Sequence, residues 1–171
     1  MSLNHCFEPG TVVNPLVSTS KYDALRELIR RAPVFGELGD RGAFEAAVIE
    51  REKSQSTGFG HGVAVAHGRV REARRVLVAL GLSAAGIPFQ SHDGEPVHLL
   101  FVIASPPDLS LDYLQALSTL IRCVREPSVR QSLLGSQDEP SLHAMIRHVF
   151  ATELGRCSIP SSGPPALATT S

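Results

Sequence analysis

The chain has no tryptophan, three cysteines and almost no net charge, and each of these scarcities argues against a class of protein. Aromatic residues make up 5% of its 171 residues, too few for the platforms on which single-stranded nucleic acids stack their bases. The 16 Lys and Arg nearly balance the 17 Asp and Glu, giving a formal net charge of -1. Nucleic-acid-binding domains instead concentrate a basic excess on one face. We therefore expect no nucleic acid among the partners.

Cysteines and long apolar segments are equally scarce. Cys6, Cys123 and Cys157 are widely spaced and contain no CxxC pair, which argues against a disulfide framework and a zinc ribbon. The first ten residues lack the basic start and apolar run of a secretory signal. The longest mostly apolar stretch, Val76 to Phe89, is interrupted by glycine and proline and is shorter than the about 20 residues of a membrane helix. We expect a cytoplasmic protein without membrane insertion.

The apolar residues that are present predict one α/β (α+β) domain. Near-continuous apolar runs predict strands, and three- and four-residue apolar spacings predict helices. Their alternation predicts a single sheet between helical layers. We assign residues 1–19 to an N-terminal segment, 20–154 to the domain and 155–171 to a tail that we expect to be disordered, because it is rich in Pro, Ser, Gly and Thr. The predicted helices cover residues 20–31, 40–53, 111–125, 127–134 and 139–150, and the predicted strands lie at 63–67, 76–82 and 97–104.

Glycines alternate with other residues just before the first predicted strand. Gly58, Gly60 and Gly62 permit close approach of the backbone to a ligand and expose N–H groups that can hold an anion. They precede a strand, whereas the glycines of a dinucleotide-binding fingerprint follow a strand and open a helix. We therefore take Gly58, Gly60, His61 and Gly62 as candidate binding residues for an anionic group.

His67 stands at the exit of the same strand, between Ala66 and Gly68, where its ring has room to reach the surface. A neutral imidazole near pH 7 is a competent nucleophile toward phosphorus, and the phosphoramidate that it forms passes the group onward readily. Backbone N–H groups and a nearby arginine would stabilise the equatorial oxygens during transfer. The alternative is that His67 is simply a polar residue at the end of a strand.

Seven histidines also suggest a metal site, but their spacing does not favour one. His61 and His67 are six residues apart, hence roughly 20 Å apart in an extended strand, too far for one ion unless the loop folds back. His143 and His148 are five apart on a predicted helix, away from the four-residue spacing that shares a face. We expect no metal and no cofactor.

The segment from Gly58 to Gly68 resembles the active-site signature of the fructose/mannitol/nitrogen-regulatory class of enzyme IIA proteins of the bacterial phosphotransferase system. Arg51-Glu52 is similar to the Arg-Glu pair at the end of that family's second helix, and residues 87–97 are similar to its turn into a central strand. The resemblance runs from about residue 20 to residue 150, most of the chain.

The resemblance implies a mixed sheet with helices on both faces and a phosphohistidine carrier. His67 would accept a phosphoryl group from the phosphohistidine of an HPr-like carrier protein or its nitrogen-branch paralogue. Arg51 would help to hold the phosphoryl group or the carrier. Sugar-type members pass the group to a IIB domain, and nitrogen-type members act mainly as regulators of target proteins. We expect the nitrogen-regulatory type, since no IIB domain is fused to this sequence.

Two residues depart from the family pattern. Ala66 replaces a common proline, and Tyr113 stands where members commonly have a second histidine. A tyrosine hydroxyl can donate one hydrogen bond but cannot become a cation near neutral pH. The alternative function is therefore a partly degenerate regulatory binding protein with little or no onward transfer. Without a functional role, Tyr113 would be half-buried packing, His61 a surface residue and Arg51 a solvated residue that suits the C-terminal end of its helix.

Overall fold

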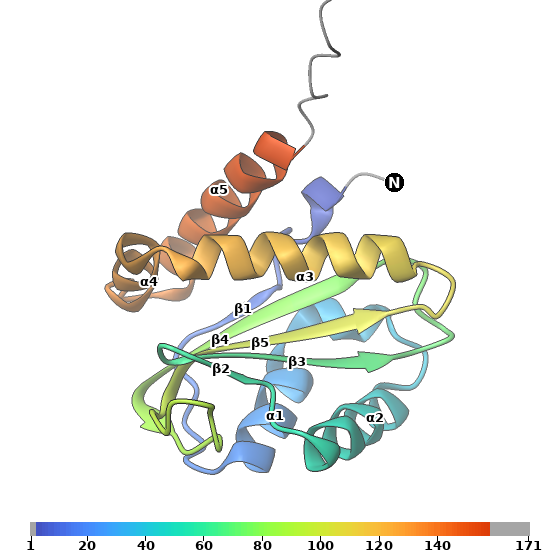
Figure 1. Ribbon diagram of the computed structural model, residues 1–171. Helices are drawn as coiled ribbons and strands as arrows, with labels where there is room; N and C mark the ends of the chain where they lie inside the picture. The colour runs from blue at the N-terminus through green and yellow to red at the C-terminus, as the bar shows by residue number, and fades with distance from the viewer. Residues whose placement is uncertain (1–2, 158–171) are drawn as a thin grey trace, which may run out of the picture.

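The computed structural model describes residues 3–157, and five strands within them form one mixed sheet in the order β1-β4-β5-β3-β2 (Figure 1). Strands β3 and β5 are parallel, as are β1 and β4, while β4 and β5 are antiparallel, as are β2 and β3. The strands are β1 (Val12–Val13), β2 (Gly58–Gly60), β3 (Val63–Arg69), β4 (Leu77–Ile87) and β5 (Val97–Ser105).

Helices cover both faces of the sheet, which confirms the predicted fold class (Figure 1). One layer consists of α1 (Lys21–Arg31) and α2 (Arg41–Ser54), and the other of α3 (Ser110–Arg125), α4 (Pro127–Leu134) and α5 (Glu139–Cys157). Short 3-10 helices at Leu3–His5 and Pro33–Glu37 complete the described elements. No helix among residues 3–157 is both long and apolar enough to cross a membrane.

The side chains of β3 alternate between these two layers. Val63 and Val65 belong to the core under α3 and α5, whereas Ala64 and Ala66 belong to the core over α1 and α2. Because successive side chains of a strand point to opposite faces, His67 lies on the α3 side and Gly68 on the α2 side. The small residues on the α2 side leave room for that helix to approach the strand closely.

Several element boundaries differ from the predicted ones. Gly58–Gly60 forms a short strand, where we expected a glycine-rich loop. α5 continues to Cys157, seven residues past the predicted end, because Leu154 still packs into the core. Residues 155–157 of the expected tail are thus helical, and residues 158–171 lie outside the described residues.

The N-terminal segment is also part of the packed unit. Val12 and Val13 pair with β4, and Leu3 and Phe7 are buried against α5 and its neighbours. The boundary that we placed at residue 20 therefore falls inside the packed structure.

Candidate functional site

His67 lies on an open edge of the sheet. β2 pairs with β3 at Val63 and Ala64, and the Val65 N–H donates to the Thr57 carbonyl (3.2 Å). Within residues 3–157, no strand pairs with this edge of β3 beyond Ala64. Main-chain groups of alternate residues point to opposite edges of a strand, so those of Val65 and His67 face away from β5. The second half of β3 therefore presents both its edge and the side chain of His67 to the surface.

The half-buried ring of His67 packs against Tyr113, in the first turns of α3. The two ring centroids are 5.4 Å apart and the ring planes are inclined by 47°. Burial lowers the pKa of His67, and the positive charges of Arg51 and Arg69 act in the same direction. The main chain of Val65 and the carboxylate of Glu52 oppose this shift. The net effect keeps the imidazole neutral near pH 7, the form that a nucleophile requires.

Tyr113 contributes a neutral hydroxyl to this arrangement. Burial raises the pKa of its phenol, while the charges of Arg51 and Arg69 lower it and offset part of that effect. The phenol thus stays protonated at neutral pH and retains one hydrogen-bond donor. The structure brings Tyr113 and His67 together.

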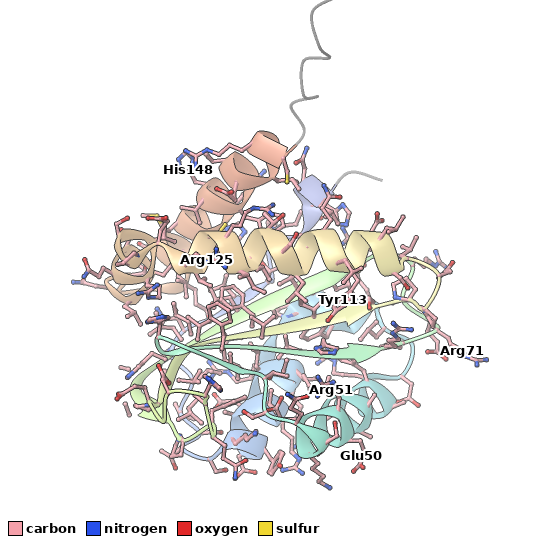
Figure 2. The ribbon with its side chains drawn as sticks, in the orientation of Figure 1. Glu50, Arg51, Arg71, Tyr113, Arg125 and His148 are labelled. Carbon is pink, nitrogen blue, oxygen red and sulfur yellow. The ribbon has the colours of Figure 1, made fainter. Side chains whose placement is uncertain are left out.

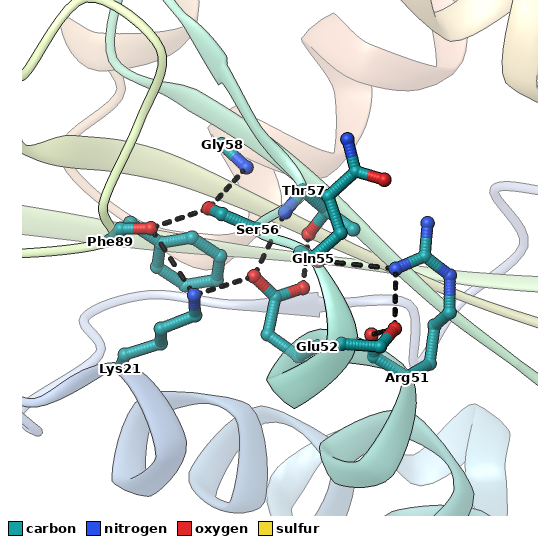
Figure 3. Close-up of polar contacts among 9 residues, drawn as sticks. Lys21, Arg51, Glu52, Gln55, Ser56, Thr57, Gly58 and Phe89 are labelled. Carbon is teal, nitrogen blue, oxygen red and sulfur yellow. Dashed lines mark hydrogen bonds and ion pairs between the residues drawn. The ribbon is translucent and has the colours of Figure 1, made fainter.

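Arg51 lies in the last turn of α2, on the opposite face of the sheet from Tyr113 (Figure 2). Its Nη1 donates to the carbonyl oxygen of Gln55 (3.1 Å) and to Oγ of Ser54 (3.4 Å) (Figure 3). These bonds satisfy acceptors in the last residue and at the C-cap of the helix. The positive charge of Arg51 lowers the pKa of both His67 and Tyr113.

Arg69 is a residue that our sequence reasoning missed. It is exposed and lies two positions after His67 on β3, hence on the same face of the sheet. Its charge lowers the pKa of both His67 and Tyr113. The two-residue period of the strand was the available signal. The positive charges of Arg51 and Arg69 thus both act on one neutral imidazole, a combination that suits a phosphoryl group.

The four other predicted binding residues do not join this site. Gly58 and Gly60 form β2, and His61 and Gly62 make the turn into β3, at the opposite end of the strand from His67. Their N–H groups are also already used in part: that of His61 donates to the Asp93 carboxylate (2.9 Å), and that of Gly58 donates to a serine hydroxyl. The structure thus separates them from His67.

A shallow hollow does lie at the His61 end of the strand, and it contains two histidines. Among residues 3–157, no three His, Cys, Asp or Glu side chains are grouped so that they could hold a metal ion. The hollow is lined by His61, Gly62, Asp93, Glu95, Pro96 and His98.

Comparison with known proteins identifies relatives over most of the chain. The family described as "Phosphoenolpyruvate-dependent sugar phosphotransferase system, EIIA 2" matches residues 6–149. A nitrogen regulatory protein of Bradyrhizobium diazoefficiens is 29% identical over 146 residues, which are 85% of this chain and 95% of that protein. The fructose-specific EIIABC component of Bacillus subtilis is 30% identical over 142 residues, which are 83% of this chain and 22% of that protein. The chain therefore corresponds to less than a quarter of this second relative.

Solved structures share the fold. The nitrogen regulatory protein IIA-Ntr of Neisseria meningitidis superposes with a TM-score of 0.76 at 24% identity, covering 86% of this chain and 98% of that one. Enzyme IIA for mannitol of Escherichia coli, solved in complex with phosphorylated enzyme IIB, gives a TM-score of 0.68 at 18% identity and covers 85% of this chain and 96% of that one. The sheet and its two helical layers are thus common to these proteins.

Proposed function

Because the chain belongs to the EIIA 2 family of the phosphoenolpyruvate-dependent sugar phosphotransferase system, we propose that it carries a phosphoryl group on His67. One observation supports this most strongly: a half-buried imidazole with a lowered pKa lies at an open strand edge, against Tyr113 and under the influence of two arginines. The lowered pKa favours a neutral nucleophile, and the two arginines favour a negatively charged group beside it.

The proposed reaction is an in-line transfer between two histidines. A ring nitrogen of His67 attacks the phosphorus of a phosphohistidine on the donor, so that a new N–P bond forms as the donor's N–P bond breaks. The electron pair of the broken bond stays on the donor imidazole. Arg51 and Arg69 would balance the charge on the three equatorial oxygens, and Tyr113 would donate a hydrogen bond to one of them.

The proposed donor is an HPr-like phosphocarrier protein or its nitrogen-branch paralogue, and the proposed recipient is a IIB domain or a regulatory target in the cytoplasm. Two leucines on α3 flank Tyr113 and suit such docking, since Leu111 is 82% exposed and Leu114 is 55% exposed. Apolar side chains around a reactive centre are typical of protein interfaces. We favour the nitrogen-regulatory type, because the nitrogen regulatory relative matches over nearly its whole length.

Tyr113 supports a second candidate function, a regulatory protein with little onward transfer. Burial raises the pKa of its phenol, so the residue supplies no positive charge at the position where family members commonly have a second histidine. A site of this kind could accept a phosphoryl group slowly and hold it. Its phosphorylation state would then alter affinity for a partner.

Labelling from phosphoenolpyruvate tests the proposal. The protein is incubated with labelled phosphoenolpyruvate, enzyme I and HPr, and acid-labile label is measured. We expect label on the natural protein and none on His67→Gln. His148→Gln is the matched control, because His148 is an exposed histidine on α5 (Figure 2). Label that persists in His67→Gln would overturn the assignment.

Two further measurements separate the carrier from the regulator. Discharge of the labelled protein by a IIB domain supports a carrier, and label that stays in place supports a regulator. If Tyr113→His takes label and the natural protein takes none, the site is degenerate at that position.

A further inference from the structure

Glu52 lies in the last turn of α2 and is buried, with 2% of its surface exposed. Its Oε1 lies 2.8 Å from Nζ of Lys21 and accepts the main-chain N–H of Thr57 at 2.9 Å, and its other oxygen accepts the Thr57 hydroxyl (Figure 3). Nζ of Lys21 also donates to the Phe89 carbonyl (3.3 Å). A buried carboxylate needs both a counter-charge and hydrogen-bond donors, and Lys21 and Thr57 supply them to Glu52.

The bond from Thr57 to Glu52 interrupts the hairpin ladder. Thr57 lies opposite Val65, whose N–H donates to the Thr57 carbonyl (3.2 Å). In an antiparallel ladder, residues paired in this way exchange two bonds, so the Thr57 N–H would ordinarily return to the Val65 carbonyl. Here that N–H donates to Glu52. The Val65 carbonyl is therefore not paired with Thr57, and it faces away from β5.

His67 is the side chain placed to use this carbonyl. It lies two residues further along the same face and edge of β3. The main chain of Val65 raises the pKa of His67, as a carbonyl that accepts a ring N–H does. Nδ1 is the ring nitrogen nearer to the backbone, so it is the one that can reach a carbonyl two residues earlier. Nε2 then carries the lone pair and points away from the strand.

We propose that Glu52 is a positioning residue for His67: by holding the N–H of Thr57, it leaves the Val65 carbonyl to accept from Nδ1–H of His67 and so directs the Nε2 lone pair outward. The ring nitrogen that attacks phosphorus would thus be fixed by a carboxylate that touches neither the ring nor the phosphoryl group. The inference rests on the proposed function for the role of His67. The tautomer of the His67 ring, however, is a property of the unphosphorylated protein.

A pair of double variants tests the proposal. Lys21→Met/Glu52→Gln removes the ion pair but keeps an amide oxygen for the Thr57 N–H, whereas Lys21→Met/Glu52→Leu removes both. Changing the two partners together leaves no buried unpaired charge, so both variants are designed to fold. The readout is the tautomer of His67, from ring 15N chemical shifts and couplings in solution. We expect the Gln variant to keep the Nδ1–H form and the Leu variant to lose at least threefold in the ratio of Nδ1–H to Nε2–H.

Two outcomes would overturn the role of Glu52. The first is the same tautomer ratio in both double variants, which is what a merely structural carboxylate predicts. The second is a predominantly Nε2–H ring in the natural protein, a result that needs no variant to fold. Phosphoryl labelling is measured separately: absent label with the expected tautomers contradicts the carrier function alone, and normal label with insensitive tautomers contradicts the positioning role alone.

Discussion

A His-Gly dipeptide occurs at each end of β3. His61-Gly62 comes just before its first residue, and His67-Gly68 lies near its last, yet the two copies have different surroundings. At the entry, His61 is exposed with φ of 56° and its N–H bonds to Asp93. At the exit, His67 is half-buried against Tyr113. The entry histidine contributes a backbone conformation, and the exit histidine contributes the side chain that we propose as the phosphoryl acceptor.

The two glycines differ in the same way. Gly62 has φ of 77°, a conformation that side chains rarely adopt. Gly68 has no such φ, but a Cβ there would lie 2.9 Å from Cγ2 of Val48 and 3.1 Å from Cε2 of Phe44 on α2. One glycine is required by the backbone and the other by packing. The two copies of the His-Gly motif thus need glycine for different reasons. The neighbouring elements, which are distant in sequence, determine the reason at each copy.

The largest expected effect is the loss of stability in Gly68→Ala. Its Cβ would push against Val48 and Phe44, which costs about 1–3 kcal/mol of unfolding free energy, measured by urea denaturation.

Gly62→Ala should cost about 1 kcal/mol through its positive φ. Asparagine separates the two causes, because it tolerates positive φ but is larger than alanine. Gly62→Asn should be milder than Gly62→Ala, and a Gly68→Asn milder than Gly68→Ala would contradict the packing explanation.

A smaller effect of opposite sign is expected for His61→Gly. Glycine relieves the left-handed conformation of residue 61 but adds freedom to the unfolded chain, so stability should rise by at most about 1 kcal/mol. Phosphoryl labelling should stay unchanged, since His61 lies at the far end of the strand. A clear loss of stability or of label in this variant would show that the entry histidine is more than a backbone element.

The smallest effect concerns pH. The folded-state pKa of His67 is lowered below its unfolded value of about 6.5, so the ring is neutral in both states above that pH. As pH falls through about 6.5, the unfolded ring binds a proton that the folded ring resists, and stability declines until the folded pKa is passed. Stability measured between pH 7.5 and 5 should therefore fall more steeply in the natural protein than in His67→Gln. Equal slopes would contradict the burial and charge effects assigned to His67.

The layers, most helices and the central strands of this fold could be predicted from the sequence. The apolar runs of β4 and β5 are buried on both faces, and α4 extends from Pro127 to Leu134 as predicted. β2 escaped prediction because two of its three residues are glycines, which leave no side-chain pattern, and its pairing depends on main-chain bonds to β3.

The site was predictable in part. His67 and Tyr113 could be connected only through a family resemblance. Their proximity depends on how α3 crosses β3, and no local sequence pattern predicts that crossing. The resemblance singled out the Arg51-Glu52 pair, but the contacts of Glu52 could not be predicted, since its partner Lys21 is 31 positions away in another helix. The glycines before β3 were misleading for the same reason: the side chain of Asp93, which occupies the N–H of His61, comes from a turn that follows β4.

The shortness of β2 has a consequence for association between molecules. Where β2 stops, no other strand among residues 3–157 covers the outer edge of β3. Such an edge is a template on which another chain can add a strand. Charged side chains are one of the means by which proteins discourage this, and Arg69 stands at that position, exposed, at the end of β3. The opening that makes the histidine reachable thus also needs protection, and one arginine can repel a second copy of the strand while attracting an anion.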